Sequence, residues 1–197
     1  MNDAQLKELI LISLEHEMGG VRIYETAVQC AQNPDLHEEL DKYLAQTRTH
    51  VDILRDVCQA MGLDPDEEIP ARDVVRTVGE ALVSAMQKAQ DAGNPDAAEI
   101  VACEAVVLAE TKDHMDWELL GKCAEKMSAA QGKALTAACE KVEDEEDEHL
   151  YHSKGWCREL WIKSLGMKAV LPPPEERQHV KTAIGAARAE KASEKRR

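Results

Sequence analysis

The stretch from Leu135 to Leu160 constrains the fold most, because its apolar residues recur every three or four positions. Such a stripe is typical of the inner face of a helix in a bundle. Glu146 and His149 occupy two central positions of this face, three residues apart and therefore on the same side of the helix. Because a buried charge without a partner is very unfavourable, an inward Glu-x-x-His indicates that a partner is present. In helix bundles that partner can be a metal ion.

Three further segments carry the same kind of stripe. We predict helices over residues 3–32, 35–62 and 96–127, with the Leu135–Leu160 helix following a turn at 128–132 and ending near residue 166. Each of the three stripes is also interrupted by polar residues near its middle: Glu17 on the first, Thr47 and His50 on the second, and Glu110 on the third. The turn Asn33-Pro34-Asp35 is short, so the first two helices should be antiparallel neighbours.

Residues 63–95 predict a long crossover that carries its own helix over 71–89. One long crossover between two helical hairpins is the topology of ferritin-like bundles. We therefore predict an all-α fold, a ferritin-like four-helix bundle over residues 1–171. Pro172, Pro173 and Pro174 should end it. Residues 172–197 are then a polar, basic-ended tail, expected to be extended. A weak helix with Val180, Ile184 and Ala187 on one face, or a docking tail for a partner subunit, is the alternative.

The composition supports helices and excludes several classes of protein. The chain has no Phe, only ten Gly and seven Pro, and a formal net charge of −14. This charge argues against a nucleic-acid binder. No run of about 18 apolar residues occurs, so we expect no membrane segment, and the N-terminus lacks a secretory pattern. A cytoplasmic protein is the default. The six cysteines form no C-x-x-C pair and are expected to be reduced core residues.

The inward polar residues match most of a dinuclear metal site. Such a site in a bundle uses a Glu from each of two helices and a Glu-x-x-His from each of the other two. The ligands predicted here are Glu17, His50, Glu110, Glu146 and His149, which fill five of the six positions. Thr47 stands at the sixth, where a bridging carboxylate is expected. Asp113 or Gln46 can supply an oxygen instead, with Asp113 the better substitute, or the second metal binds weakly, or the site is vestigial.

Each of these residues also has an ordinary structural interpretation. The tract 142–149 holds six acids, so a solvated acidic face explains many of them without a metal, and Glu176-x-x-His179 in the tail matches the motif by chance. His50 can be a buried neutral histidine bonded to Thr47 or to a carbonyl. His114 and Glu143 are possible supporting groups, and Tyr24 and Tyr43 are possible hydrogen-bond donors or one-electron relays near the site.

Two stretches resemble a known family. The segments NPDLHEELDKYLAQTRTHVDILRDVCQAMGLDP, preceded by Glu17, and AETKDHMDW are similar to the first hairpin and the third helix of the bacterial stress-associated YciE/YciF-type ferritin-like proteins. In the second stretch Glu110 and Asp113 stand at that family's two carboxylate positions. The resemblance spans roughly residues 5–165 and implies a ferritin-type bundle, a homodimer and a di-iron type centre. Where that family has a carboxylate on the second helix, this chain has Gln46 beside Thr47.

Three hypotheses of function follow. The first is a metal-binding stress protein that holds iron, or else manganese or zinc, between four helices and reacts it with O2 or peroxide. The second is a structural or interaction bundle whose polar interior forms a hydrogen-bonded network without productive chemistry. The third is a storage cage like ferritin, which a mass measurement in solution would test.

Overall fold

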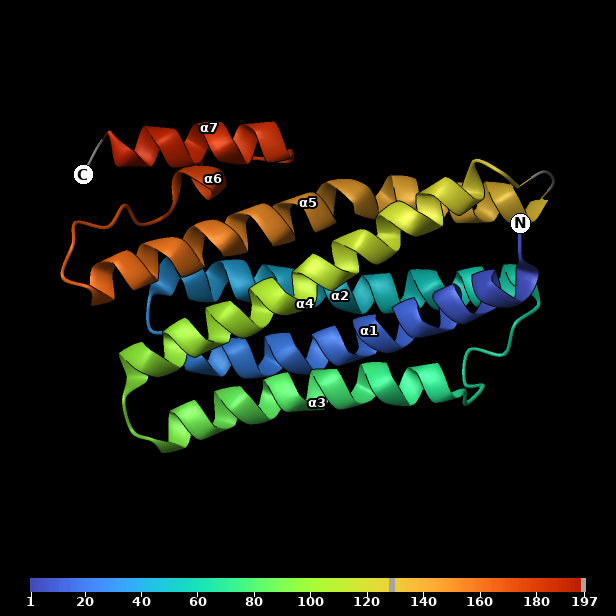
Figure 1. Ribbon diagram of the computed structural model, residues 1–197, viewed down its shortest axis with the longest axis horizontal. Coiled ribbons are helices and arrows are strands. Elements are labelled where there is room, and N and C mark those ends of the chain that lie inside the picture. Colours follow the sequence, from blue (N-terminus) through green and yellow to red (C-terminus); the bar gives the residue numbers. More distant parts are fainter. Residues whose placement is uncertain (128–129, 196–197) are drawn as a thin grey trace.

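Every regular element in the described part of the chain, residues 1–127 and 130–195 of the computed structural model, is a helix. The all-α prediction is therefore confirmed. The helices are α1 (Asp3–Cys30), α2 (Pro34–Met61), α3 (Pro70–Asp91), α4 (Pro95–Ala124), α5 (Ala130–Ser164), α6 (Pro174–Arg177) and α7 (Ala183–Glu194) (Figure 1). The predicted turn at 128–132 includes residues 128 and 129, which lie outside the described residues. None of the described helices combines the length and the apolarity needed to cross a membrane.

Local sequence determines where the long helices begin and end. Asn2, Asn33 and Asn94 precede α1, α2 and α4, and each accepts backbone N–H groups of the first turn through its side chain. Proline occupies the first position of α2, α3 and α4, where its missing N–H costs nothing. Gly62 ends α2 in the left-handed region, at φ 70°.

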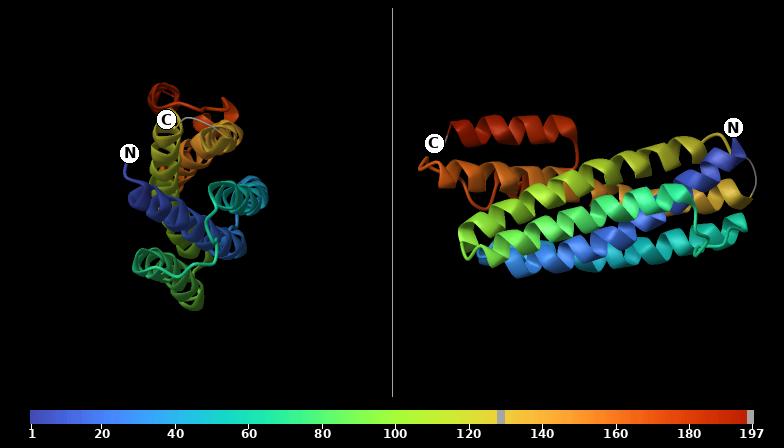
Figure 2. Two further views of the ribbon diagram at one scale, coloured as in Figure 1. Left: turned by 90° about the vertical axis from the view of Figure 1, so that its right-hand side faces the viewer. Right: turned by 60° about the horizontal axis from the view of Figure 1, so that its bottom comes forward.

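Four long helices surround one interior. The α1 helix packs against α2 and α4, and α5 packs against the same two helices, while α3 lies outside on α1 and α4 (Figures 1 and 2). The buried apolar residues form two clusters, one containing Leu6 to Leu14 of α1 and the other Ile23 to Cys30. The middle of α1, which carries Glu17, lies between them. The interior therefore consists of two apolar ends separated by a polar layer.

Two arginines attach the crossover helix α3 to α1. Arg72 is buried and donates from Nε to Glu15 Oε2 at 3.0 Å and from Nη1 to the carbonyl of Pro65 at 2.7 Å. Burial raises the pKa of Glu15, but its bonds to Arg76 and Arg72 outweigh burial and lower it. These contacts fix the loop that precedes α3 as well as the helix.

Small residues let α3 approach α1 closely. A Cβ atom on Gly79 would lie 3.7 Å from the Cα atom of Gly19. Gly19 is followed directly by Gly20, and adjacent glycines in a helix mark either a kink or a close helix contact. The helix continues through both residues, so close contact is their observed role.

The C-terminal segment differs from the extended tail that was expected. Residues 183–194 are helical, and Glu175 of α6 is buried against α5. Arg158 of α5 pairs with Glu175 at 2.7 Å. A Cβ atom on Gly155 would lie 2.7 Å from Glu175 Oε2, so this glycine makes room for the buried carboxylate. The alternative apolar face is only partly correct, because Val180 is buried whereas Ile184 is 68% exposed.

Candidate metal centre

The polar layer brings together the five predicted ligands and Asp113, the better of the two predicted substitutes. All of them are buried: Glu17, His50, Glu110, Asp113, Glu146 and His149. Within the described residues, nine buried side-chain nitrogen or oxygen atoms have no hydrogen-bond partner, and seven of those nine belong to these six residues. Buried polar atoms are normally paired, so such a concentration needs a physical explanation. Cations bound among these residues are one such explanation.

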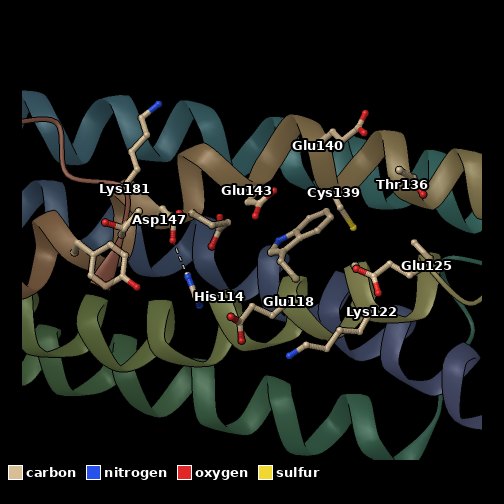
Figure 3. Close-up of a pocket in the computed structure, with 16 residues that line it drawn as sticks. His114, Glu118, Lys122, Glu125, Thr136, Cys139, Glu140, Glu143, Asp147 and Lys181 are labelled. Atoms are coloured by element: carbon tan, nitrogen blue, oxygen red, sulfur yellow. Dashed lines mark hydrogen bonds and ion pairs between the residues drawn. The ribbon is translucent and has the colours of Figure 1, made fainter. Parts of the chain in front are cut away.

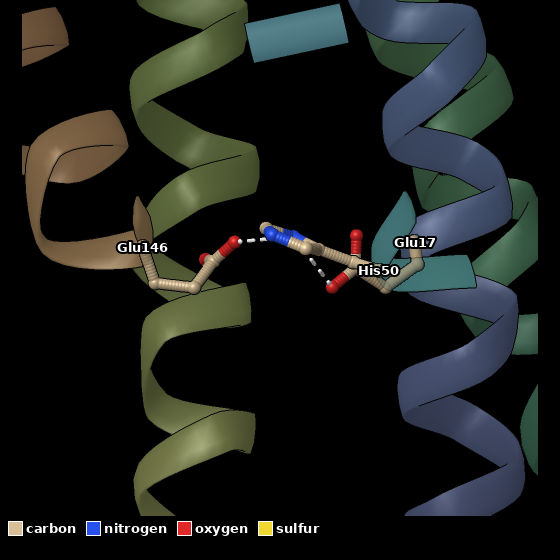
Figure 4. Close-up of side chains that lie close together, drawn as sticks. All are labelled: Glu17, His50 and Glu146. Carbon is tan, nitrogen blue, oxygen red and sulfur yellow. Dashed lines mark ion pairs between the residues drawn. The ribbon is translucent and has the colours of Figure 1, made fainter. Parts of the chain in front are cut away.

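The first group of side chains comes from three helices. His50 Nδ1 on α2 lies 3.5 Å from Glu17 Oε1 on α1 and 3.0 Å from Glu146 Oε1 on α5 (Figure 4). The three residues offer ligand atoms that lie within 4.8 Å of one another. His50 Nδ1 makes no aligned hydrogen bond despite these short distances. The atoms therefore face a common point, which is the geometry that a metal ion requires.

The second group shares a residue with the first. His149 Nδ1 on α5 lies 3.5 Å from both Glu110 Oε2 on α4 and Glu146 Oε1. Glu110, Glu146 and His149 also offer ligand atoms within 4.8 Å of one another. Glu146 Oε1 thus lies within 3.5 Å of both imidazoles. The two histidine rings stack at 5.7 Å between centroids, so the two groups are immediate neighbours.

The far nitrogen of each histidine has a partner from the opposite hairpin. His50 Nε2 lies 2.8 Å from Glu145 Oε2, and His149 Nε2 lies 3.0 Å from Gln46 Oε1. Both partners are acceptors, so they hold a proton on Nε2, and the neutral form of each ring presents the lone pair of Nδ1 to the interior. This is how outer partners orient metal-ligating histidines. Gln46, considered above as an oxygen ligand, contacts His149 on its outer side instead.

An aromatic donor holds each of the two outer carboxylates. Trp117 Nε1 on α4 donates to Glu17 Oε1 at 2.8 Å, and the Tyr24 hydroxyl on α1 donates to Glu110 Oε1 at 2.8 Å. Each donor follows the inward glutamate of its own helix by seven residues and binds the glutamate of the other helix. One oxygen of each carboxylate is fixed in this way, and the other, Oε2, has no partner.

The centre without a metal holds opposite charges in a dry interior. Burial alone lowers the pKa of both histidines, but the nearby carboxylates of Glu146 and Glu17 raise the pKa of His50 to about 11. The carboxylates of Glu110 and Glu146 likewise raise the pKa of His149 to about 9. Burial raises the pKa of Glu146, and the two imidazoles outweigh burial and lower it. Protons on the histidines therefore occupy the place that a cation would take.

Asp113 and Thr47 define how complete the centre is. Burial, followed by the charges of Glu17, Glu146 and Glu110, raises the pKa of Asp113 well above its ordinary value. Its Oδ1 has no partner, yet Asp113 belongs to neither compact ligand group. The Thr47 hydroxyl donates to the carbonyl of Tyr43 at 2.9 Å, so it is already satisfied within α2. The position expected for a second bridging carboxylate therefore carries no free ligand atom.

A second polar cluster lies beside the centre on α2 and α5. The Tyr43 hydroxyl contacts Glu39 and lies 2.9 Å from His152 Nδ1, while its ring lies 4.2 Å from that of His149 between centroids. Tyr43 was predicted near the site, whereas Glu39 and His152 were not. His152 lies off the predicted stripe, and its Nδ1 contacts Tyr43 and Glu39 of α2.

The other candidates lie outside the centre. His114 Nε2 pairs with Asp147 Oδ1 at 2.8 Å, and Glu143 is exposed. Sequence reasoning missed Glu145 as the partner of His50, because it is one of six acids in a row and faces the neighbouring helix. A signal in the sequence could have found it, because Glu145 and Gln46 occupy equivalent positions. Each stands four residues before the inward histidine of its own helix and contacts the histidine of the other helix.

The donor set fits a divalent cation. Three carboxylates and two imidazoles with free inward atoms provide the oxygen and nitrogen ligands that iron, manganese and zinc all accept. Two ligand groups that share one carboxylate provide for two ions side by side. Comparison of the chain with protein-family models, with curated proteins and with solved structures finds no match.

Proposed function

We propose that this protein is a ferritin-like four-helix bundle that binds two metal ions, iron or else manganese, in the layer between its hairpins. The observation that carries the proposal is the position of Glu146, whose Oε1 lies 3.0 Å from His50 Nδ1 and 3.5 Å from His149 Nδ1. One carboxylate between two histidines on different helices is the arrangement that bridges a pair of cations. The resemblance to the YciE/YciF-type proteins supports the same assignment.

The reaction that suits this site is oxidation of Fe(II) by O2 or peroxide. Two Fe(II) ions held by these carboxylates and histidines would each give up one electron, and O2 or peroxide would be reduced by the two. Glu17, Glu110 and Glu146 balance the positive charge, which favours the oxidised metal. Trp117 and Tyr24 hold the two outer carboxylates in place, and Glu145 and Gln46 fix the histidine rings. The apolar clusters close the two ends of the layer.

A second candidate function is a structural bundle in which the polar layer does no chemistry. Thr47 favours it, because its hydroxyl is bonded within α2 and no second bridging carboxylate is present at that position. In this case the protonated histidines and their carboxylates form an internal ion-pair network. The network would then favour one specific packing of the helices, at the free-energy cost of burying its charges.

Metal analysis and titration distinguish the two functions. The protein is purified after growth in iron- and manganese-rich medium, its metal content is measured, and the stripped protein is titrated with Fe(II) without oxygen. We expect up to two ions per chain, and Glu146→Gln should weaken binding by more than the roughly 100-fold that loss of a supporting partner costs. Glu38→Gln, an exposed change on α2, is the matched control.

The oxidation assay completes the test. Wild-type protein and the Glu38→Gln control should oxidise Fe(II) with O2 or peroxide faster than the buffer does, and Glu146→Gln should not. A wild-type protein that carries no metal and binds none on titration would overturn the proposed function. Tight binding without accelerated oxidation would leave a metal-binding protein and would remove the proposed reaction.

A further inference from the structure

A pocket between α4 and α5 leads from the surface to the candidate centre. It has a volume of about 490 Å³, and Glu146 and Trp117 are among the residues that line it. Figure 3 shows this pocket, with Glu118, Glu143 and Asp147 on its wall. Glu146 is 2% exposed, and neither of its carboxylate oxygens has a hydrogen-bond partner. Trp117 donates to Glu17 from the same region. The pocket therefore reaches the side chain of Glu146, the residue that both ligand groups share, and the carboxylate oxygens lie buried just behind its wall.

The wall of this pocket is strongly acidic. Six carboxylate side chains line it against two lysines, Lys122 and Lys181. Lys181 Nζ forms an ion pair with Asp144 Oδ2 at 2.9 Å. Glu118 on α4 and Glu143 on α5 are exposed at opposite sides of the pocket. A hollow lined by one sign of charge focuses the field and raises the local concentration of the opposite ion.

We propose that this pocket is the route by which divalent cations enter and leave the centre, drawn in by its acidic wall. This inference rests on the proposed function, because it needs a metal at Glu146. The interior on either side of the polar layer is closed by an apolar cluster, which a hydrated cation does not cross. Along the pocket, exposed carboxylates lie before the buried side chain of Glu146, whose unpartnered oxygens a cation would reach past the pocket wall.

Gly121 offers a way to close the route. It lines the pocket, and a Cβ atom on it would meet nothing within 4 Å. Gly121→Trp should therefore fill the hollow without touching a ligand, and Gly121→Ala, which adds a single methyl group, is its matched control. His114 of α4 and Asp147 of α5 pair across the same pocket at 2.8 Å, and this ion pair should hold the two helices together when the tryptophan ring is added.

The experiment measures the rates of Co²⁺ binding and release. Association with the metal-free protein is followed by stopped-flow absorption of Co²⁺, and dissociation by transfer to excess EDTA. Gly121→Trp should slow both rates by at least about 10-fold and leave the equilibrium affinity unchanged, because a plug alters the path and not the bound state. Gly121→Ala should keep wild-type rates.

A charge variant tests the acidic wall separately and does not depend on the plug folding. Glu118→Gln/Glu143→Gln should slow association about 3- to 10-fold at 10 mM salt, and the difference should shrink at 0.5 M salt, where charges are screened within a few ångströms. Glu38→Gln/Glu80→Gln, exposed changes outside the pocket, should keep wild-type rates.

The outcomes separate this inference from the proposed function. If the wild type binds Co²⁺ but neither variant slows association, the route is wrong and the metal centre stands. If Gly121→Trp instead weakens equilibrium binding of Co²⁺ and leaves its association rate unchanged, the route is also wrong. If the wild type binds no Co²⁺, Fe(II) or Mn²⁺ at all, the proposed function fails, and the route fails with it.

Discussion

The Cγ2 methyl group of Thr47 lies 3.2 Å from the point where a Cβ atom on Gly20 would stand. Thr47 precedes the inward histidine of α2 by three residues, as Glu146 does on α5. Gly20 follows the inward glutamate of α1 by three residues, as Asp113 does on α4. The second hairpin thus carries two carboxylates where the first carries a methyl group packed on a glycine. The centre is asymmetric in charge although its two hairpins share a plan.

Thr47→Glu should make the two hairpins alike. The new side chain has no branch at Cβ, so it removes the methyl group at Gly20 and directs a carboxylate to the polar layer. Metal-free protein should unfold at a lower temperature, because another buried acid lacks a partner. The affinity for the second Co²⁺ ion should rise at least about 10-fold. Thr47→Gln is the neutral control, and equal affinities for the two variants would contradict the prediction.

The outer partners of the histidines should affect metal affinity without contacting the metal. Glu145→Ala releases His50 Nε2, and Gln46→Ala releases His149 Nε2. Each change should weaken Co²⁺ binding by about 10- to 100-fold, as loss of such supporting bonds does elsewhere. Titration calorimetry measures the effect, with Glu38→Ala as control. Affinities within twofold of the wild type would show that the rings do not depend on these bonds.

The stability of the metal-free protein should fall as the pH rises above 6.5. The pKa of His50 is raised to about 11 and that of His149 to about 9, against 6.5 for an ordinary histidine. A raised pKa stabilises the folded state fully below pH 6.5, and this contribution is lost as the pH passes through the folded pKa values. Unfolding temperatures measured in EDTA from pH 6.5 to 10 should therefore decrease.

Metal should reverse part of this dependence. A cation displaces the Nδ1 protons, so Co²⁺ affinity should increase with pH over the same range and each binding event should release protons. His50→Gln/His149→Gln provides the comparison, because it lacks both titrating groups. If this double variant shows the same loss of stability with pH as the wild type, the two histidines are not its cause.

Regular features of the chain could be predicted, and contacts between elements could not. The four helix stripes place Glu17, His50, Glu110 and Glu146 inward because a period of 3.6 residues leaves each helix one buried face. The same period does not say which neighbour Glu145 faces, since that depends on how far α5 rotates against α2. The docking of the C-terminal segment was missed for a similar reason, because it depends on a partly buried ion pair between Arg158 of α5 and Glu175 of α6.

Gly155→Ala should loosen the C-terminal segment and leave the centre intact. The added methyl group would lie 2.7 Å from Glu175 Oε2 and 2.9 Å from Pro173 Cβ, so the segment must shift. Overpacking of this kind costs roughly 1–3 kcal/mol. Limited proteolysis should then cleave between residues 168 and 182 faster than in the wild type, with Co²⁺ affinity unchanged. Gly121→Ala is the control, and identical cleavage rates for both variants would contradict the prediction.

The bonds that position the centre all run between the hairpins: Trp117 to Glu17, Tyr24 to Glu110, Glu145 to His50, and Gln46 to His149. Neither hairpin on its own therefore contains the bonds that fix its ligands. Any fluctuation that parts the two would disorder every ligand at once, so occupancy and assembly should be gained and lost as one cooperative event. A cation bound in the layer would join the two hairpins, because its ligands come from both of them.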